Sequence, residues 1–197
     1  MPAGMMPIGP FGAYGKIPAL GDFLNVRISA GFVAPWDQWL QAGLPALRAC
    51  LGDRWQACYF SAPIWRFTLA AGVAGPQAAL GVMMPSVDRV GRQFPLTLVT
   101  LLRDVPPHDA AADTFAALEE LALDALDDLP RDAFVARLGL ISAPPEGHDS
   151  RTVWMTGPLD GARRLELDQL PNVAQMQTLF DMDAPAWRVM ADKADPA

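Results

Sequence analysis

The sequence predicts a layered α/β fold in which helices cover both faces of a mainly apolar sheet. Residues 78–84 and 96–102 form two near-continuous apolar runs bounded by Gly and Pro, as is typical of buried strands. A strand that is apolar throughout needs a covering layer on each face. Two segments with apolar residues at helical spacing, around 36–51 and 114–129, can provide those layers.

The first elements of the chain follow the same patterns. Residues 11–17 alternate apolar and polar side chains and predict a strand weakened by glycine, followed by a turn at 18–23. Pro35 suits the first turn of the next helix. Pro45 removes a backbone donor, so we expect this helix to kink or to restart after Gly43.

The remaining pattern completes one predicted domain, residues 11–183, with a flexible N-terminus at 1–10 and a loose C-terminal tail at 184–197. Further strands are predicted at 55–60, 64–70 and 152–156, the last at a sheet edge, and further helices at 132–138 and 173–180. The helix at 114–129 has an acidic outer face, interpreted as solvated, formed by Glu119, Glu120, Asp124, Asp127 and Asp128.

Composition excludes several classes of function. The 197 residues are 51% apolar and carry a net charge of −7 without any Lys- or Arg-rich run. A nucleic-acid binder or a polybasic membrane anchor needs clustered cations, so neither is expected. No stretch reaches the roughly 18 apolar residues of a membrane span, and the N-terminus lacks the features of a secretion signal. Cys50 and Cys58 are interpreted as two free, buried thiols, with a disulfide between them as the alternative. Free thiols, with no predicted signal or membrane span, predict a cytoplasmic protein.

Two charged loops form the candidate site. The loop 85–95 joins the two apolar strands and carries Asp88, Arg89 and Arg92. Loops held by a rigid scaffold often carry function. Asp88 and Arg92 could equally form only an ion pair that closes the turn, and both interpretations stay open.

The second charged loop follows the first strand and contributes Lys16 and Asp22. Arg66 lies among large apolar residues of a predicted strand, where an unpaired guanidinium would be costly. We expect its partner to be Asp22 or Asp88, which would tie the strand to a loop.

No enzyme or cofactor motif is complete. Gly15-Lys16 resembles a phosphate loop, but Pro10 and Ile17 replace the required glycine and hydroxyl residue. His108 and His148 have no second histidine or cysteine at metal-ligand spacing. We therefore predict a protein without catalytic residues, metal or cofactor. The tryptophans at 36 and 39 have helical spacing and are interpreted as core instead of a binding stripe.

Four blocks of residues in this chain resemble the TagF (ImpM) family, accessory proteins of bacterial type VI secretion. The blocks are Gly15-Lys16-Ile17-Pro18-x-x-Gly21-Asp22-Phe23, Pro35-Trp36-Asp37-x-Trp39-Leu40, Ala62-Pro63-Ile64-Trp65-Arg66-Phe67 and Pro85-Ser86-Val87-Asp88-Arg89-Val90-Gly91-Arg92-x-Phe94-Pro95-Leu96. The C-terminal half matches more loosely, because its Val153-Trp154-Met155-Thr156 strand has one tryptophan fewer than the family pattern.

The resemblance implies a three-layer α/β/α sandwich without known enzyme activity. It implies a negative regulator that acts after translation by binding a protein of the secretion apparatus, with a link to the forkhead-associated scaffold Fha. The partner-binding candidates carried over by position are Lys16, Asp22, Arg66, Asp88, Arg89 and Arg92. The alternative is a small enzyme or anion-binding protein that uses the Lys16/Asp22 and Asp88/Arg92 loops.

Overall fold

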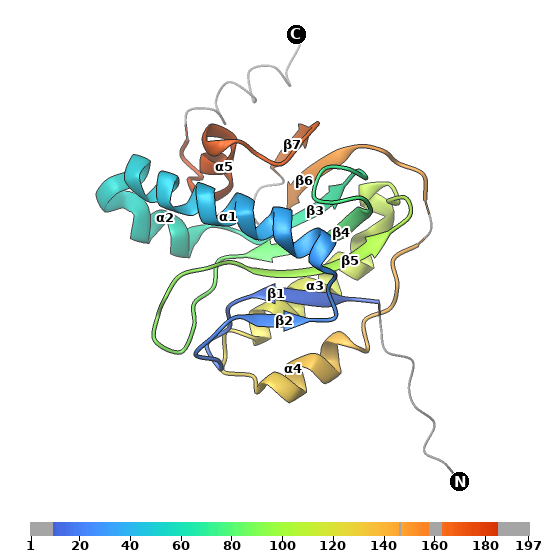
Figure 1. Ribbon diagram of the computed structural model, residues 1–197, viewed down its shortest axis with the longest axis horizontal. Coiled ribbons are helices and arrows are strands. Elements are labelled where there is room, and N and C mark those ends of the chain that lie inside the picture. The colour runs from blue at the N-terminus through green and yellow to red at the C-terminus, as the bar shows by residue number, and fades with distance from the viewer. Residues whose placement is uncertain (1–9, 146, 158–162, 185–197) are drawn as a thin grey trace.

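In a computed structural model of the chain, residues 10–145, 147–157 and 163–184 are described, and their strands form one sheet flanked by helices (Figure 1). The strands are β1 Gly12–Gly15, β2 Leu24–Val26, β3 Trp65–Leu69, β4 Ala78–Met84, β5 Leu96–Leu102, β6 Thr152–Thr156 and β7 Arg164–Leu167. The α-helices are α1 Ala30–Leu51, α2 Trp55–Ser61, α3 Ala112–Asp124, α4 Arg131–Leu138 and α5 Val173–Phe180. Two 3₁₀ turns, Gly52–Arg54 and His108–Ala111, precede α2 and α3.

The sheet has the order β2-β1-β5-β4-β3-β6-β7, and every neighbouring pair is antiparallel. Its centre is the local meander β3-β4-β5, and the predicted apolar strands 78–84 and 96–102 are β4 and β5. The expectation that residues 152–156 form an edge strand was wrong. Residues 164–167 form β7 on the outer side of β6, with Leu165 opposite Trp154.

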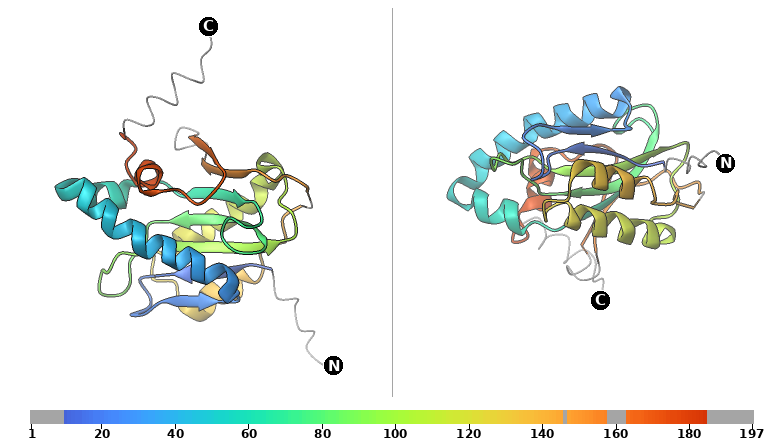
Figure 2. Two further views of the ribbon diagram at one scale, coloured as in Figure 1. Left: turned by 45° about the horizontal axis from the view of Figure 1, so that its top comes forward. Right: turned by 90° about the horizontal axis from the view of Figure 1, so that it is seen from below.

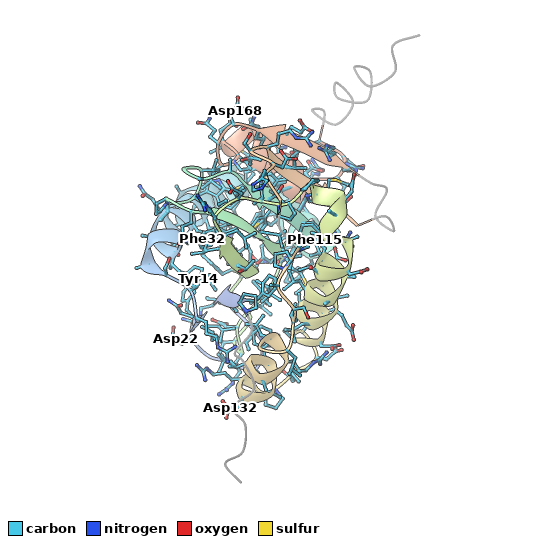
Figure 3. All side chains as sticks on the ribbon, turned by 90° about the vertical axis from the view of Figure 1, so that its right-hand side faces the viewer. Tyr14, Asp22, Phe32, Phe115, Asp132 and Asp168 are labelled. Atoms are coloured by element: carbon cyan, nitrogen blue, oxygen red, sulfur yellow. The ribbon has the colours of Figure 1, made fainter. Side chains whose placement is uncertain are left out.

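Helices cover both faces of this sheet, which confirms the three-layer α/β/α architecture. α1, α2 and α5 lie over one face, and α3 and α4 over the other (Figure 2). Figure 3 places Phe32 of α1 and Phe115 of α3 on opposite sides of the sheet. Each face therefore has its own apolar core, and alternate residues of a strand belong to different cores.

Trp36 of α1 is buried in the core, as predicted, and Trp39 is partly buried and packs against that core. The Trp36 ring is stacked on the Trp154 ring of β6, with their centroids 6.0 Å apart. Trp36 Nε1 donates to Thr97 Oγ1 at 3.0 Å, and Trp39 Nε1 donates to the Pro171 carbonyl at 2.7 Å. Both indole N–H groups thus have acceptors, as is usual for tryptophan that is removed from water.

α1 differs from its prediction. It begins at Ala30, before the predicted Pro35 start, and continues through Pro45 to Leu51 without restarting. Pro45 and Gln41, the residue four positions before it, are both exposed. The carbonyl that loses its donor therefore faces water, which lowers the cost of an internal proline.

Residues 55–60 form a helix, so the predicted strand was wrong. Trp55, Cys58 and Tyr59 are buried in α2 at positions i, i+3 and i+4, which is the helical spacing. A six-residue apolar segment fits both periods, and the turn at Gly52–Arg54 continues α1 directly into α2.

Other differences concern element ends. α3 stops at Asp124 instead of 129, and the chain then turns through Asp128, whose φ is +57°. β2 and β7 were not predicted, since each has only three or four residues. Residues 1–9 of the predicted flexible N-terminus and 185–197 of the predicted tail lie outside the described residues.

Candidate functional site

Asp88 is the centre of the polar loop between β4 and β5. Its carboxylate accepts hydrogen bonds from Arg92 Nε at 2.6 Å and from the Val90 and Arg92 backbone N–H groups at 3.1 and 2.9 Å. Lys16 Nζ lies 3.0 Å from the same carboxylate, and the Asp88 side chain is 0% exposed. Asp88 therefore closes the turn from within and is not presented to a ligand.

Burial opposes ionisation of Asp88, but its hydrogen bonds outweigh that effect. The donors are the Arg92 backbone, Lys16, the Arg92 side chain and the Val90 backbone, and together they hold the pKa of Asp88 below its usual range. The carboxylate is thus ionised at neutral pH and balances the buried Lys16 ammonium.

The two charged loops of the candidate site lie side by side. Arg89 donates its backbone N–H to the Leu20 carbonyl at 2.8 Å and its Nη2 to the Ala19 carbonyl at 2.6 Å. Arg92 Nη2 donates to the Gly21 carbonyl at 2.7 Å. Residues 18–23 and 85–95 consequently form one unit, the two-loop platform.

Gly15 explains how β1 reaches this platform. Its φ is +132°, and a Cβ built there would lie 2.0 Å from the Pro95 carbonyl oxygen. Only glycine permits that approach and that backbone conformation. The Gly15-Lys16 pair, which resembles a phosphate loop in sequence, instead brings Lys16 to Asp88.

Asp22 does not join the ion pairs of the platform. Its Oδ1 accepts from the backbone N–H of Phe23 at 2.7 Å and stabilises its own turn. The Phe23 ring contacts the Phe94 ring at 4.8 Å, and Lys16 Nζ lies 5.2 Å from the Phe23 ring centroid. An anion-binding site would need Asp22, Asp88 and Arg92 to converge on a pocket open to solvent. The buried Asp88 side chain does not favour that alternative.

The predicted partner of Arg66 was wrong. Arg66 Nε and Nη2 donate to the two carboxylate oxygens of Glu119 in α3, each at 2.7 Å. The interpretation of Glu119 as part of a solvated face was also wrong, because it pairs with β3 beneath its helix. Arg66 is thus paired with α3, whereas Lys16 and Arg92 are paired with Asp88 at the platform.

An apolar groove of about 790 Å³ lies between α2, α3 and the platform. Its walls include Pro18 and residues 85–87 from the platform and the Arg66–Glu119 pair. Three large apolar side chains at the groove are exposed, at 62%, 52% and 39%: Phe60, Leu123 and Leu126. The sequence patterns missed this groove, because they predicted a strand at 55–60 and a helix that continues to 129.

Phe60 also lines a second hollow of about 480 Å³, between α1, α2 and the loop 85–95. That hollow includes Arg48, Arg92 and Gln93. Trp55 Nε1 donates to Gln93 Oε1 at 2.7 Å and fastens α2 to the loop 85–95. The exposed Phe60 ring thus stands between two recesses that border the same platform.

His108 lies in an apolar environment, away from the platform. His108 is 7% exposed with its ring 4.6 Å from that of Phe115, and its ring nitrogens have no hydrogen-bond partner among the described residues. Burial, then the positive charge of Arg164, lowers the pKa of His108 to about 4. Within residues 10–145, 147–157 and 163–184, no group of three His, Cys, Asp or Glu side chains is placed to hold a metal ion.

The two cysteines differ in environment. Cys58 is buried, whereas Cys50 is exposed, so the prediction of two buried thiols was half wrong. Burial raises the pKa of the Cys58 thiol, which disfavours the nucleophilic thiolate. No described helix has the length and apolarity to cross a bilayer.

Comparison with known proteins assigns more than half of the chain to a family. Residues 12–139 match the model of the TagF N-terminal domain, described as type VI secretion system-associated. The chain belongs to this family. The matched region contains all six candidate residues, both loops of the platform, and the helices α2 and α3 that border the groove.

A solved structure supports the assignment of the fold beyond the matched region. This chain is similar to PA0076 from Pseudomonas aeruginosa PAO1, whose crystal structure it matches at 28% sequence identity with a TM-score of 0.77. The match covers 88% of this chain and 94% of that chain. No curated protein sequence matches the chain. The protein is therefore type VI secretion-associated, with the TagF fold extending over most of its length.

Proposed function

We propose that this protein is a non-enzymatic, cytoplasmic negative regulator that acts after translation by binding a protein component of the type VI secretion apparatus. One observation carries the proposal: the rigid two-loop platform borders an open groove with three exposed apolar side chains. Large exposed apolar patches on a folded domain typically mark interaction sites.

The chemistry of this surface indicates what it would bind. Asp88 is already neutralised by Lys16 and Arg92, whereas Arg89 and the Arg92 side chain remain exposed at the platform. A partner segment that places an apolar side chain beside Phe60 and Leu123, with a carboxylate toward the arginines, would match both features. Buried apolar anchors give most binding energy, and the charges direct orientation.

A secretion assay with matched variants tests the proposal. In cells that lack their own copy, Leu123→Asp should fail to restrain secretion, because a charge enters the apolar groove. Leu140→Asp is the control, since Leu140 is 65% exposed and lies in a separate hollow beyond α3. Restraint by a folded Leu123→Asp variant at the wild-type level would count against the groove.

The forkhead-associated scaffold Fha is the first partner to test, because the family resemblance links the two proteins. Purified Fha and the full chain should associate in a calorimetric titration, and Leu123→Asp should weaken the complex more than Leu140→Asp. Normal restraint without any Fha binding would exclude Fha while leaving the regulatory role to another component.

A further inference from the structure

The outer strand β7 ends the described part of the sheet and pairs with β6 on one side only. The register sets Thr152 opposite Leu167 and Trp154 opposite Leu165. The Thr156 N–H donates to the Arg163 carbonyl at 3.0 Å, so this opposed pair is hydrogen-bonded. Hydrogen-bonded and non-hydrogen-bonded pairs alternate along an antiparallel ladder. Leu165 therefore directs its N–H and C=O toward β6.

The same alternation fixes the groups on the free edge. Arg164 and Glu166 occupy the non-hydrogen-bonded positions, so their N–H and C=O groups point away from β6. Within the part of the chain that the structure describes, β7 is the last strand on this side. These four backbone groups form a template for another strand.

The opposite edge of the sheet is different. β2 has three residues and is followed at once by Arg27, whose φ is +52°. That left-handed residue turns the chain out of the strand direction, which blunts the edge. β7 has regular backbone through its four residues, so it is the better edge for pairing.

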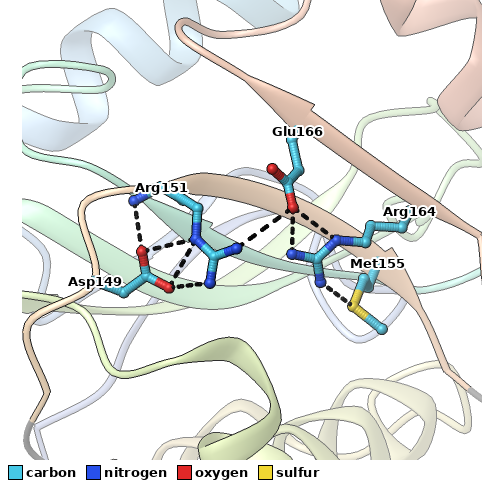
Figure 4. Close-up of polar contacts among 5 residues, drawn as sticks. All are labelled: Asp149, Arg151, Met155, Arg164 and Glu166. Carbon is cyan, nitrogen blue, oxygen red and sulfur yellow. Dashed lines mark hydrogen bonds and ion pairs between the residues drawn. The ribbon is translucent and has the colours of Figure 1, made fainter.

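Charges on β7 discriminate between partners. Arg164 and Glu166 are exposed, with their side chains on the face opposite the buried Leu165. In Figure 4, Arg164 Nε and Nη2 contact Glu166, and Arg151 links Glu166 to Asp149. A neighbouring strand is favoured if it places a negative side chain opposite Arg164 and a positive one opposite Glu166, and it is repelled if like charges are opposed.

A second copy of β7 has that reversed order. In an antiparallel pair centred on Leu165, Arg164 of one copy lies opposite Glu166 of the other, and the arrangement occurs twice by symmetry. Both residues carry outward backbone groups, so the two opposed pairs are also the hydrogen-bonded ones. A register centred on Arg164 or on Glu166 would instead set like charges face to face.

We propose that β7 pairs with β7 of a second copy of this chain, in the antiparallel register centred on Leu165, to join two sheets across a two-fold axis. Such an isologous contact closes on itself and leaves no further free edge there. The interface is short, so association belongs to the weak class that forms at micromolar concentrations or above.

Sedimentation velocity of the full chain tests the proposal over about 1 µM to 1 mM, the range in which small interfaces associate. The wild type should dimerise reversibly. Arg164→Glu and Glu166→Arg should each weaken the dimer by about tenfold or more, because two like-charge pairs replace two opposite ones. The double variant Arg164→Glu/Glu166→Arg restores complementarity and should dimerise like the wild type.

Hydrogen exchange supplies a measurement that needs no substitution. The Arg164 and Glu166 amides should exchange more slowly as the wild-type concentration rises, while the Leu165 amide changes little because it already bonds β6. A wild type that stays monomeric at the highest concentration overturns the proposal. So does a dimer that both single charge reversals leave intact, or protection of these amides only by a different protein.

Discussion

Arg66 and Glu119 form a two-pronged ion pair that joins β3 to α3, with both guanidinium–carboxylate distances at 2.7 Å. The side chains are 14% and 19% exposed, and both line the apolar groove. The pair therefore fastens a covering helix to the sheet at the place where the surface is open.

Removing one partner of this pair should cost more than removing both. We expect Arg66→Met to lower the free energy of unfolding by about 2 kcal/mol, because Glu119 keeps its charge in a mostly apolar setting. The double variant Arg66→Met/Glu119→Met should recover most of that loss, since methionines can fill the space. Urea unfolding of the single and double variants measures both values, and a double variant that sums two single losses would contradict the expectation.

Asp88 should matter more for stability than its ion-pair partner Arg92. Asp88→Asn leaves the Lys16 ammonium buried without a counter-charge, so we expect a clear fall in the thermal midpoint. Arg92→Met removes a side chain that is mostly exposed and should cost less than about 1 kcal/mol. Equal losses in the two variants would show that the buried lysine finds another partner.

Gly15 and Gly21 provide a matched pair of glycine substitutions. Gly15→Ala should destabilise by more than about 2 kcal/mol, because its Cβ meets the Pro95 carbonyl and φ is positive. Gly21→Ala should be almost neutral, since nothing lies within 4 Å of the position that the new Cβ would take. Calorimetric melting of both variants measures the two stability losses. Equal losses in Gly15→Ala and Gly21→Ala would contradict the prediction.

His108 should make stability depend on pH. Its pKa is about 4 in the folded protein and about 6.5 when unfolded, so the unfolded chain binds more protons between these values. Stability is full above pH 6.5 and should fall by about 3 kcal/mol on acidification to pH 4.

One substitution isolates that contribution. His108→Leu should flatten the slope of unfolding free energy between pH 6.5 and 4, because it removes the buried imidazole. Asp88, whose pKa is lowered, adds stability that is lost only as pH falls below the usual aspartate range. Unfolding in urea at several pH values separates the two effects.

Arg89→Glu tests the platform as a contact surface. We expect the fold to survive, because the side chain is exposed and donates one hydrogen bond to the Ala19 carbonyl. Restraint of secretion should be relieved, since a carboxylate replaces a guanidinium facing the proposed acidic segment. Arg89→Met is the control for losing the guanidinium, with its charge and its hydrogen bond, without adding a carboxylate. Restraint by a folded Arg89→Glu variant would argue against this loop.

The sequence patterns predicted the layers well because burial leaves a strong periodic signal. β4, β5 and α5 were found at their observed bounds, since continuous apolar runs and helical spacing report directly on packing. α5 also begins with a capping box between Asn172 and Gln175, a local signal that tertiary contacts do not alter.

The groove and the partner of Arg66 could not be predicted in the same way. Glu119 is 53 residues from Arg66 in the chain, and its spacing equally fits a solvated helix face. The apolar residues of the short α2 fit a strand period as well as a helical one, so the exposure of Phe60 could not be predicted from them. Ion pairs between distant segments and the shape of the surface depend on how the helices pack on the sheet. The periodicity of a single segment does not report on that packing.

The strand order has a consequence during synthesis. β1 lies between β2 and β5, and Ala13 pairs with Leu98, so the first strand cannot pair with β5 until about half of the chain has left the ribosome. Until then the early β1–β2 hairpin has no sheet to join, and the later β3-β4-β5 meander can assemble before it. Nascent chains stalled beyond β5 should resist protease at β1, whereas chains stalled before Leu96 should be cut there.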